Sequence, residues 1–292
     1  MIDRRQFSAG AFFAAIAAAA PAVAATSSAR RKDILNALKQ LEVKSLGRLG
    51  VHMIAPNGQE FGYRSDERFM MLSSFKTLAS AFVLARVDSG VERLDRRIRY
   101  GQKDLVDWSP VTKDHADGEG LTLAELCHAA VTTSDNTAAN LILNSFGGPQ
   151  ALTRFMRHTG DRVTRLDRIE PELNVRHGTE PLDTTSPRAM VHTLKRLLAP
   201  GILSEPSRRQ LQQWLVSNTT GGKRLKAGLP AGWTSGDKTG TNQSDANDVG
   251  VLFPPHGAPI HVSAYLAEST AGSAIKEQTL AEVGRIAATL AG

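Results

Sequence analysis

The chain has 292 residues, of which 41% are hydrophobic and 22% are charged, and its formal net charge is +6. This composition is that of an ordinary folded protein with enough apolar residues for a full core, and it excludes a disordered or fibrous chain. Because the basic residues are scattered and aromatic residues make up only 5% of the chain, the sequence also argues against nucleic-acid binding.

The first residues have the pattern of an export signal. Arg4-Arg5 precede an apolar run at residues 9–20, and Ala22-Val23-Ala24 offers a small-residue cleavage site. This order predicts a twin-arginine signal peptide over residues 1–25 and a mature chain in the periplasm. The alternative is a membrane anchor, but the apolar run is shorter than the roughly 20 residues of a spanning helix. We therefore expect no membrane attachment in the mature form.

Both ends of the remaining chain carry the elements of one antiparallel sheet. Apolar residues at helical spacing predict a helix over residues 31–44, and two predicted strands follow on either side of an Asn-Gly pair at residues 57–58. Asn-Gly tolerates the positive φ angles of a tight hairpin turn. Near the other end, residues 248–253 and 260–267 are predicted strands, and residues 274–290 are predicted to form a closing amphipathic helix.

Helical signals fill the middle of the chain, residues 71–218. Thr122 with Glu125, for example, has the spacing of a capping box. We therefore predict an α/β fold of the α+β kind, in which residues 26–70 and 219–292 form an antiparallel sheet flanked by N- and C-terminal helices. The middle segment is an inserted all-helical domain, and the active site is expected at the junction of the two.

Ser73 and Lys76 lie three residues apart at the start of a predicted helix, so the lysine nitrogen is placed beside the serine hydroxyl. A serine hydroxyl is a poor nucleophile until a neighbouring base takes its proton. The alternative is that Ser73 caps the helix and Lys76 is a solvated charge. The pair alone favours that second interpretation.

Three further motifs favour the catalytic interpretation of Ser73 and Lys76. They are Ser134-Asp135-Asn136 between two predicted helices, Glu170-Pro171-Glu172-Leu173-Asn174 on a loop, and Lys238-Thr239-Gly240-Thr241 on a predicted strand. Each motif alone is ordinary, because serine and aspartate often cap helices and lysine and threonine are common on strands. Together with Ser73 and Lys76 in this order, they resemble the class A serine β-lactamases. The resemblance covers essentially all of the chain after residue 25.

The resemblance implies an acyl transfer in which Ser73 attacks the β-lactam carbonyl. Its proton is taken either by Lys76 directly or by Glu170 through water. Ser134 is expected to relay a proton to the departing β-lactam nitrogen. Asn136 is expected to hold Lys76 and the side-chain amide of the substrate.

The loop that carries Glu170 decides the fate of the acyl-enzyme. A carboxylate at Glu170 and an amide at Asn174 can hold one water molecule, and the carboxylate can take its proton as the water attacks the ester carbonyl. By resemblance to the family, a salt bridge between Arg168 and Asp183 is expected to close this loop.

The Lys-Thr-Gly strand is expected to bind the substrate. Lys238 and Thr239 would hold its carboxylate, and Gly240 would let it approach the backbone closely. The backbone N–H groups of Ser73 and Thr241 would form the oxyanion hole.

Two more residues are expected to bind the substrate. Many family members place an arginine in the strand after this motif, but residues 244–248 contain none, so Arg224 is the expected substitute. The alternative is that Arg224 is a surface residue. Trp108 takes the place of an aromatic residue at the rim of the family's active site, and the alternative is a partly buried loop tryptophan.

No cofactor and no metal are expected. The histidines from His115 onward show no metal-ligand spacing. Cys127 is the only cysteine, so it forms no intrachain disulfide, and its apolar surroundings predict a buried structural thiol.

We predict that the protein is a monomer that hydrolyses the β-lactam ring of penicillins and cephalosporins. This activity would confer antibiotic resistance. One alternative is a transpeptidase or carboxypeptidase of the penicillin-binding type, but such enzymes usually lack the pair Glu170 and Asn174 and are usually tethered to the membrane. The other alternative is a penicillin-sensing domain that stays acylated. It would need a membrane segment or a signalling domain.

Overall fold

The computed structural model describes residues 19–291. Residues 1–18 of the predicted signal peptide lie outside this range. Helix α1 (Ala19–Ser45) begins before the predicted start at residue 31. None of the helices within the described range is long and apolar enough to cross a membrane.

A five-stranded antiparallel sheet joins the two ends of the chain. Its strands are β1 (Arg48–Ile54), β2 (Glu60–Tyr63), β7 (Thr234–Thr241), β8 (Ala246–Phe253) and β9 (Ile260–Ala267). The order β2-β1-β9-β8-β7 places the first hairpin at one edge and β7 at the other. The predicted α/β fold with an antiparallel sheet is therefore confirmed.

The turn between β1 and β2 is the predicted Asn-Gly turn. Gly58 has a φ of 82°, and its N–H donates to the carbonyl oxygen of Ala55 at 2.9 Å. A residue with a side chain is strained at this φ, which explains the glycine.

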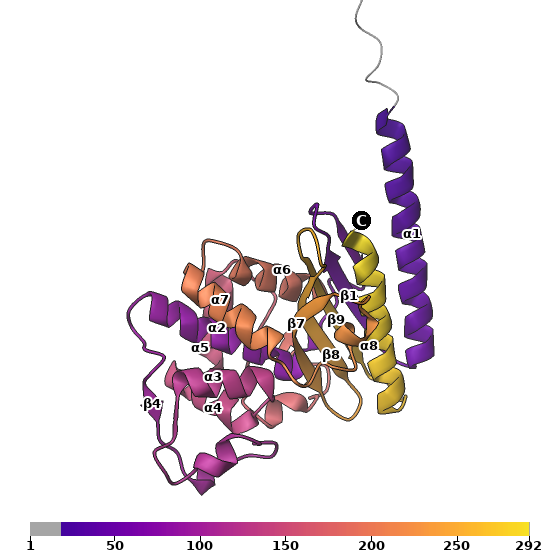
Figure 1. Cartoon of the computed structure of the whole chain (residues 1–292). Coiled ribbons are helices and arrows are strands. Elements are labelled where there is room, and N and C mark those ends of the chain that lie inside the picture. Colours follow the sequence, from indigo (N-terminus) through magenta and orange to yellow (C-terminus); the bar gives the residue numbers. More distant parts are fainter. Residues whose placement is uncertain (1–18, 292) are drawn as a thin grey trace, which may run out of the picture.

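Two helices cover one face of the sheet. The long helix α1 and the C-terminal helix α8 (Ser273–Ala288) lie side by side there (Figure 1). Leu38 and Leu280 are fully buried between these helices and the strands. Each such side chain contributes about 1.5–3 kcal/mol by leaving water. This layer forms the first hydrophobic core.

Six helices fill the middle of the chain and enclose a second core (Figure 1). They are α2 (Phe75–Asp88), α3 (Leu123–Thr132), α4 (Asn136–Ser145), α5 (Gly148–His158), α6 (Pro187–Leu198) and α7 (Glu205–Val216). Helix α2 contacts α3, α4, α5 and α7, and most of its side chains are buried. Helix α6 packs against β1 and β9 of the sheet.

Short elements complete the chain. Two small antiparallel pairs, which the sequence did not predict, are β3 (Phe69–Met70) with β6 (Thr184–Thr185) and β4 (Arg97–Ile98) with β5 (Leu121–Thr122). The 3₁₀ turns are η1 (Leu72–Ser74), η2 (Gln102–Asp104), η3 (Thr112–His115), η4 (Glu172–Asn174), η5 (Leu225–Gly228) and η6 (Thr289–Ala291).

Local capping sets two of the helix starts. The Thr122 hydroxyl accepts from the N–H of Glu125, and the Glu125 carboxylate accepts from the N–H of Thr122, which confirms the predicted capping box of α3. Helix α4 begins differently, because the carboxylate of Asp135 accepts from the N–H of Ala138 at 2.8 Å. Asp135 is therefore the cap of α4, and the hydroxyl of the preceding Ser134 stays available.

Candidate active site

Ser73 lies in the turn η1, which leads directly into α2. Lys76 Nζ donates to Ser73 Oγ at 3.0 Å, and the Lys76 side chain is fully buried. Ser74 stands at the N-cap of α2 and forms no side-chain cap. The interpretation of Ser73 as a helix cap and Lys76 as a solvated charge is therefore wrong.

Lys76 is surrounded by acceptors from three segments. Its Nζ donates to the carbonyl oxygen of Ser134 at 2.9 Å and to Oδ1 of Asn136 at 2.5 Å, and it lies 3.0 Å from Oε1 of Glu170. Burial lowers the pKa of Lys76, and the Glu170 carboxylate partly opposes this effect. Lys76 therefore releases its proton more easily than a lysine in water does, which suits a general base.

Ser134 lies between two lysines. Its Oγ accepts from Lys76 Nζ at 3.3 Å and from Lys238 Nζ at 3.1 Å. Burial, and next to it the nearby positive charge of Lys76, hold the pKa of Lys238 well below its usual range. A hydroxyl between two such nitrogens can pass a proton onward to a leaving group.

Asp135 fixes the backbone around Ser134. Besides capping α4, its carboxylate accepts from the N–H groups of Val111 and Thr112, both at 2.9 Å, and from the hydroxyl of Thr112 at 2.8 Å. Ser134 itself has a φ of 62°, which costs energy for a residue other than glycine. The contacts of Asp135 stabilise the segment against this strain, so the role of Asp135 is structural.

Glu170 lies across from the nucleophile. Its Oε1 accepts from Ser73 Oγ at 3.5 Å, and its Oε2 accepts from Nδ2 of Asn174. The carboxylate is fully buried. Oδ1 of Asn174 is also buried and has no hydrogen-bond partner among the described residues. A free acceptor beside a carboxylate is the arrangement expected of a pair that orients a water molecule.

The loop around Glu170 is closed as predicted. Arg168 Nε donates to Oδ2 of Asp183 at 2.6 Å, which confirms the expected salt bridge. Oδ1 of Asp183 also accepts from the backbone N–H groups of Asp167 and Arg168. A second nitrogen of Arg168 donates to the carbonyl oxygen of Val175 at 2.8 Å, on the far side of Glu170. The two residues thus tie both ends of the loop together.

Asn140 also holds Glu170, and the sequence analysis missed it. Asn140 Oδ1 accepts from the N–H of Glu170, and Asn140 Nδ2 donates to its carbonyl oxygen, both at 2.9 Å. One amide side chain of α4 thereby fixes the peptide groups on both sides of the Glu170 Cα. The signal in the sequence that could have pointed to Asn140 was its position as a lone polar residue in an apolar helical stretch.

Strand β7 forms the other wall of the active site. Lys238 is fully buried, and Thr239 Oγ1 lies 2.5 Å from the hydroxyl oxygen of Thr220. The structure adds a second reason for Gly240 to the predicted one. A Cβ at Gly240 would lie 2.9 Å from Cβ of Leu72 and 3.0 Å from the carbonyl oxygen of Met71. The glycine therefore lets β7 pack closely against η1, which brings Ser73 and the strand together.

Arg224 is buried behind β7, so it is not the surface residue of the alternative interpretation. One guanidinium nitrogen donates to the carbonyl oxygens of Gly240 at 2.9 Å and Asn247 at 2.6 Å, and the other donates to Oγ1 of Thr241 at 2.6 Å. Burial lowers the pKa of Arg224, with the carboxylate of Asp248 opposing the shift. The guanidinium thus brings positive charge to the end of β7.

These residues surround one cavity of about 400 Å³. Its lining consists of Ser73, Trp108, Ser134, Asn136, Asn174, Thr220, Arg224, Thr239, Gly240 and Thr241. Three more predicted site residues, Lys76, Glu170 and Lys238, lie beneath this lining. The structure therefore brings together all twelve predicted site residues, and it adds Thr220.

Trp108 stands at the mouth of the cavity. Its side chain is mostly solvent-exposed, with 65% of the residue surface accessible, and its indole N–H donates to the carbonyl oxygen of Thr133 at 3.0 Å. The interpretation as a partly buried loop tryptophan is therefore wrong. Cys127, in contrast, is buried in α3, and burial raises the pKa of its thiol to about 12. It is a structural residue, as predicted.

Comparison with known proteins identifies the family. A family model described as the β-lactamase enzyme family matches residues 31–290. An ancestral class A β-lactamase is 56% identical, with a TM-score of 0.85, and the match covers 87% of this chain and 98% of that chain. The last common ancestor of Gram-negative bacterial class A β-lactamases is 55% identical, with a TM-score of 0.86 and coverage of 88% and 98%.

A natural sequence matches as well. The chain named PenP from Rhodopseudomonas palustris is 51% identical, with a TM-score of 0.86, and the match covers 88% of this chain and 99% of that chain. Since the family model spans most of the chain and solved class A enzymes are 55% and 56% identical to it over the aligned residues, the chain belongs to the β-lactamase enzyme family as a class A serine β-lactamase, which hydrolyses the β-lactam amide through a serine acyl-enzyme.

Proposed function

We propose that this enzyme hydrolyses penicillins and cephalosporins, with Ser73 as the nucleophile and Glu170 as the base of deacylation. The observation that carries the proposal is the position of Lys76 Nζ, 3.0 Å from both Ser73 Oγ and Glu170 Oε1. A nucleophile, an amine and a carboxylate in contact supply the proton transfers that acylation and deacylation both require.

In the acylation step, Ser73 Oγ forms a bond to the lactam carbonyl carbon and loses its proton. The acceptor is either Lys76, in direct contact, or Glu170 through a water molecule. The C–N bond of the ring then breaks, and the nitrogen takes a proton from Ser134, which is replenished from Lys76 or Lys238. The contacts of Ser134 with both lysines support this relay.

In the deacylation step, a water molecule attacks the ester carbonyl of the acyl-enzyme while Glu170 takes its proton. The bond to Ser73 Oγ breaks, and the serine recovers the proton that Glu170 took, directly or through Lys76. The hydrogen bond from Asn174 to Glu170 and the free Oδ1 of Asn174 support the role of this pair in holding the water. Arg224, Thr239 and Thr241 would bind the substrate carboxylate.

The test is time-resolved intact-mass spectrometry of the protein mixed with benzylpenicillin. We expect rapid turnover by the wild type and a stable adduct on Glu170→Ala. The matched control is Glu172→Ala, an exposed charge two residues away, which should turn over like the wild type. A long-lived adduct on the wild type would favour the transpeptidase or sensor alternative, and the absence of both adduct and product would refute the proposal. Hydrolysis assays with a cephalosporin test the substrate range.

We also propose that the enzyme is exported to the periplasm by the twin-arginine route and acts there as a monomer. The support is the order of Arg4-Arg5, an apolar run and small residues before residue 26. Fractionation of cells that express the full chain or the Arg4→Lys, Arg5→Lys variant tests the route. We expect β-lactamase activity in the periplasmic fraction for the full chain and retention of the variant in the cytoplasm. Light scattering of the purified protein tests the monomer.

A further inference from the structure

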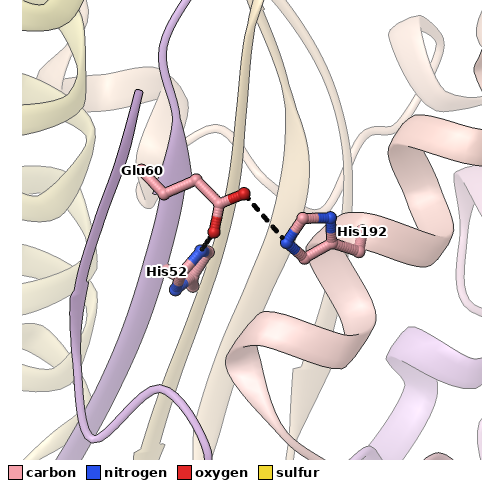
Figure 2. A group of neighbouring side chains, drawn as sticks. All are labelled: His52, Glu60 and His192. Carbon is pink, nitrogen blue, oxygen red and sulfur yellow. Dashed lines mark hydrogen bonds and ion pairs between the residues drawn. The ribbon is translucent and has the colours of Figure 1, made fainter. Parts of the chain in front are cut away.

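Three side chains that could ligate a metal ion meet outside the active-site cavity, which none of them lines. They are His52 on β1, Glu60 on β2 and His192 on α6 (Figure 2). His52 Nε2 lies 2.9 Å from Oε2 of Glu60, and His192 Nε2 lies 3.2 Å from Oε1 of the same carboxylate. In the sheet, β9 and β8 separate β1 from β7. This cluster is therefore independent of the catalytic residues.

The spacing of the three ligand atoms fits a small divalent ion. The nearest nitrogen and oxygen atoms of His52, Glu60 and His192 all lie within 4.8 Å of one another. Zinc binds imidazole nitrogen and carboxylate oxygen at about 2.0–2.2 Å in tetrahedral geometry, which places neighbouring ligand atoms about 3.4 Å apart. His52 and His192 each contact a different oxygen of the Glu60 carboxylate, at 2.9 Å and 3.2 Å, and small side-chain rotations can bring both nitrogens and one oxygen around a single ion. Two imidazoles and one carboxylate are a ligand set that zinc uses when one position is left for water.

The surroundings of His52 hold its ring in place. Its Nδ1 lies 3.0 Å from Oγ of Ser65, and that hydroxyl in turn donates to the carbonyl oxygen of Val51 at 3.3 Å. When Nδ1–H donates to the serine oxygen, Nε2 is the ring nitrogen left to bind an ion beside Glu60. Outer hydrogen bonds of this kind orient metal-ligating histidines.

A glycine makes room for this hydrogen bond. Gly62 pairs with His52 across the two strands, and a Cβ at Gly62 would lie 1.9 Å from Oγ of Ser65 and 2.7 Å from Nδ1 of His52. Any residue with a side chain would therefore push Ser65 away from the ring. The absence of a side chain at this position preserves the support of His52.

Burial and charge act on the cluster in opposite directions. His52 is almost fully buried, which shields its ring from water. Glu60 and His192 are about one-third exposed, which leaves a path for an ion. Arg188 opposes a cation, because one of its nitrogens lies 3.1 Å from Oε2 of Glu60. The carboxylate of Asp66 accepts two hydrogen bonds from the same guanidinium and offsets part of its charge.

We propose that His52, Glu60 and His192 bind a divalent transition-metal ion, with zinc as the best fit, and that this ion clamps helix α6 to the hairpin of β1 and β2. The ion would join the sheet to a helix of the inserted segment. Because it binds the folded chain, it stabilises the fold by mass action. The role is structural, since the cluster lies apart from the cavity that holds Ser73.

The test is zinc titration by calorimetry and thermal unfolding on tag-free, EDTA-treated protein. We expect one ion per chain and a rise in Tm of several degrees at saturation. Glu60→Gln and His192→Ala should each weaken zinc binding at least about ten-fold and remove most of the rise in Tm. The matched control is His256→Ala, which removes an exposed histidine elsewhere and should change neither quantity.

Two further measurements keep the proposal falsifiable if a variant folds poorly. Cobalt added to the wild type should give the visible absorption of a four-coordinate ion, and zinc should abolish it. Arg188→Gln removes the opposing charge and should tighten zinc binding, whereas a cluster that serves only as an ion-pair network predicts no such gain. Equal zinc affinity of the wild type and His192→Ala, or a cobalt spectrum of the hydrated ion, would overturn the proposal.

Discussion

Oε1 of Glu170 lies 3.0 Å from Nζ of Lys76, and both side chains are completely buried. Charges that close are poorly screened inside a protein, so the carboxylate affects the protonation of Lys76. Burial alone lowers the pKa of Lys76, and the carboxylate raises it again. Removal of the carboxylate should therefore let Lys76 lose its proton at a lower pH.

This relationship separates the two candidate bases of acylation. In Glu170→Gln, the acidic limb of the single-turnover acylation rate should move down by about one pH unit or more if Lys76 is the base. If Glu170 is the base, acylation by the variant should instead be slow at every pH, with no shift of the limb. Stopped-flow measurement of acylation by benzylpenicillin between pH 5 and 9 distinguishes the two, and Glu172→Gln is the control that should match the wild type.

The salt bridge between Arg168 and Asp183 should matter for deacylation more than for acylation. Arg168→Ala removes the bridge and the hydrogen bond to Val175, so Glu170 loses its fixed position. We expect deacylation to slow by about ten- to a hundred-fold, since misplacement of a catalytic group by about 1 Å can cost that much. Hydrogen exchange of the loop should rise in parallel.

The control for this change is Arg162→Ala, an exposed arginine near the start of the same segment. It should leave both deacylation and exchange unchanged. Wild-type deacylation and loop protection in Arg168→Ala would show that the bridge does not position Glu170.

Arg224 should act on the substrate carboxylate. Arg224→Ala removes the guanidinium that supports Gly240 and Thr241, and we expect kcat/KM for benzylpenicillin to fall by about a hundred-fold, as for loss of a charged hydrogen bond of about 3 kcal/mol. A penicillin methyl ester lacks the negative charge, so its kcat/KM should fall much less. Lys223→Ala, at the exposed neighbouring position, is the control. Equal losses for acid and ester would assign Arg224 a role in packing alone.

The sequence predicted the elements whose signals are local. The Asn-Gly turn at residues 57–58 and the capping box of Thr122 and Glu125 depend on neighbours in the chain, and both formed as expected. The motif residues were also found, because each lies beside a turn or a helix start that fixes its direction. Their convergence on one cavity followed from resemblance to the family and not from the spacing itself.

The features that the sequence did not predict depend on distant packing. Asn140 holds Glu170, which lies 30 residues away, and the local signal, a polar residue in an apolar helical stretch, does not identify that partner. The second reason for Gly240 lies in its contact with Leu72, which only the approach of β7 to η1 creates. His52 and His192 likewise meet because α6 packs on β1. The spacing of residues along the sequence reveals metal ligands only when they lie on one element or one turn.

His261 should make stability depend on pH. It lies on β9, and burial, with a smaller contribution from Lys195, lowers its pKa to about 4. As the pH falls below 6.5, the unfolded chain binds a proton at His261 that the folded chain does not bind. The contribution of neutral His261 to the free energy of unfolding is thus complete above pH 6.5 and is lost as the pH falls toward 4. The loss amounts to about 3 kcal/mol, at 1.36 kcal/mol per pKa unit.

His261→Gln removes the titrating ring while it keeps a neutral polar side chain. Carboxylates also titrate in this range, so the informative quantity is the difference between the variant and the wild type. In urea unfolding at pH 7 and pH 4.5, the wild type should lose about 2–3 kcal/mol more than His261→Gln between the two conditions. His256→Gln, at an exposed turn, should behave like the wild type. An identical loss in the wild type and in His261→Gln would mean that His261 is protonated in the folded chain as easily as in the unfolded chain, and that its burial is not a source of the acid sensitivity.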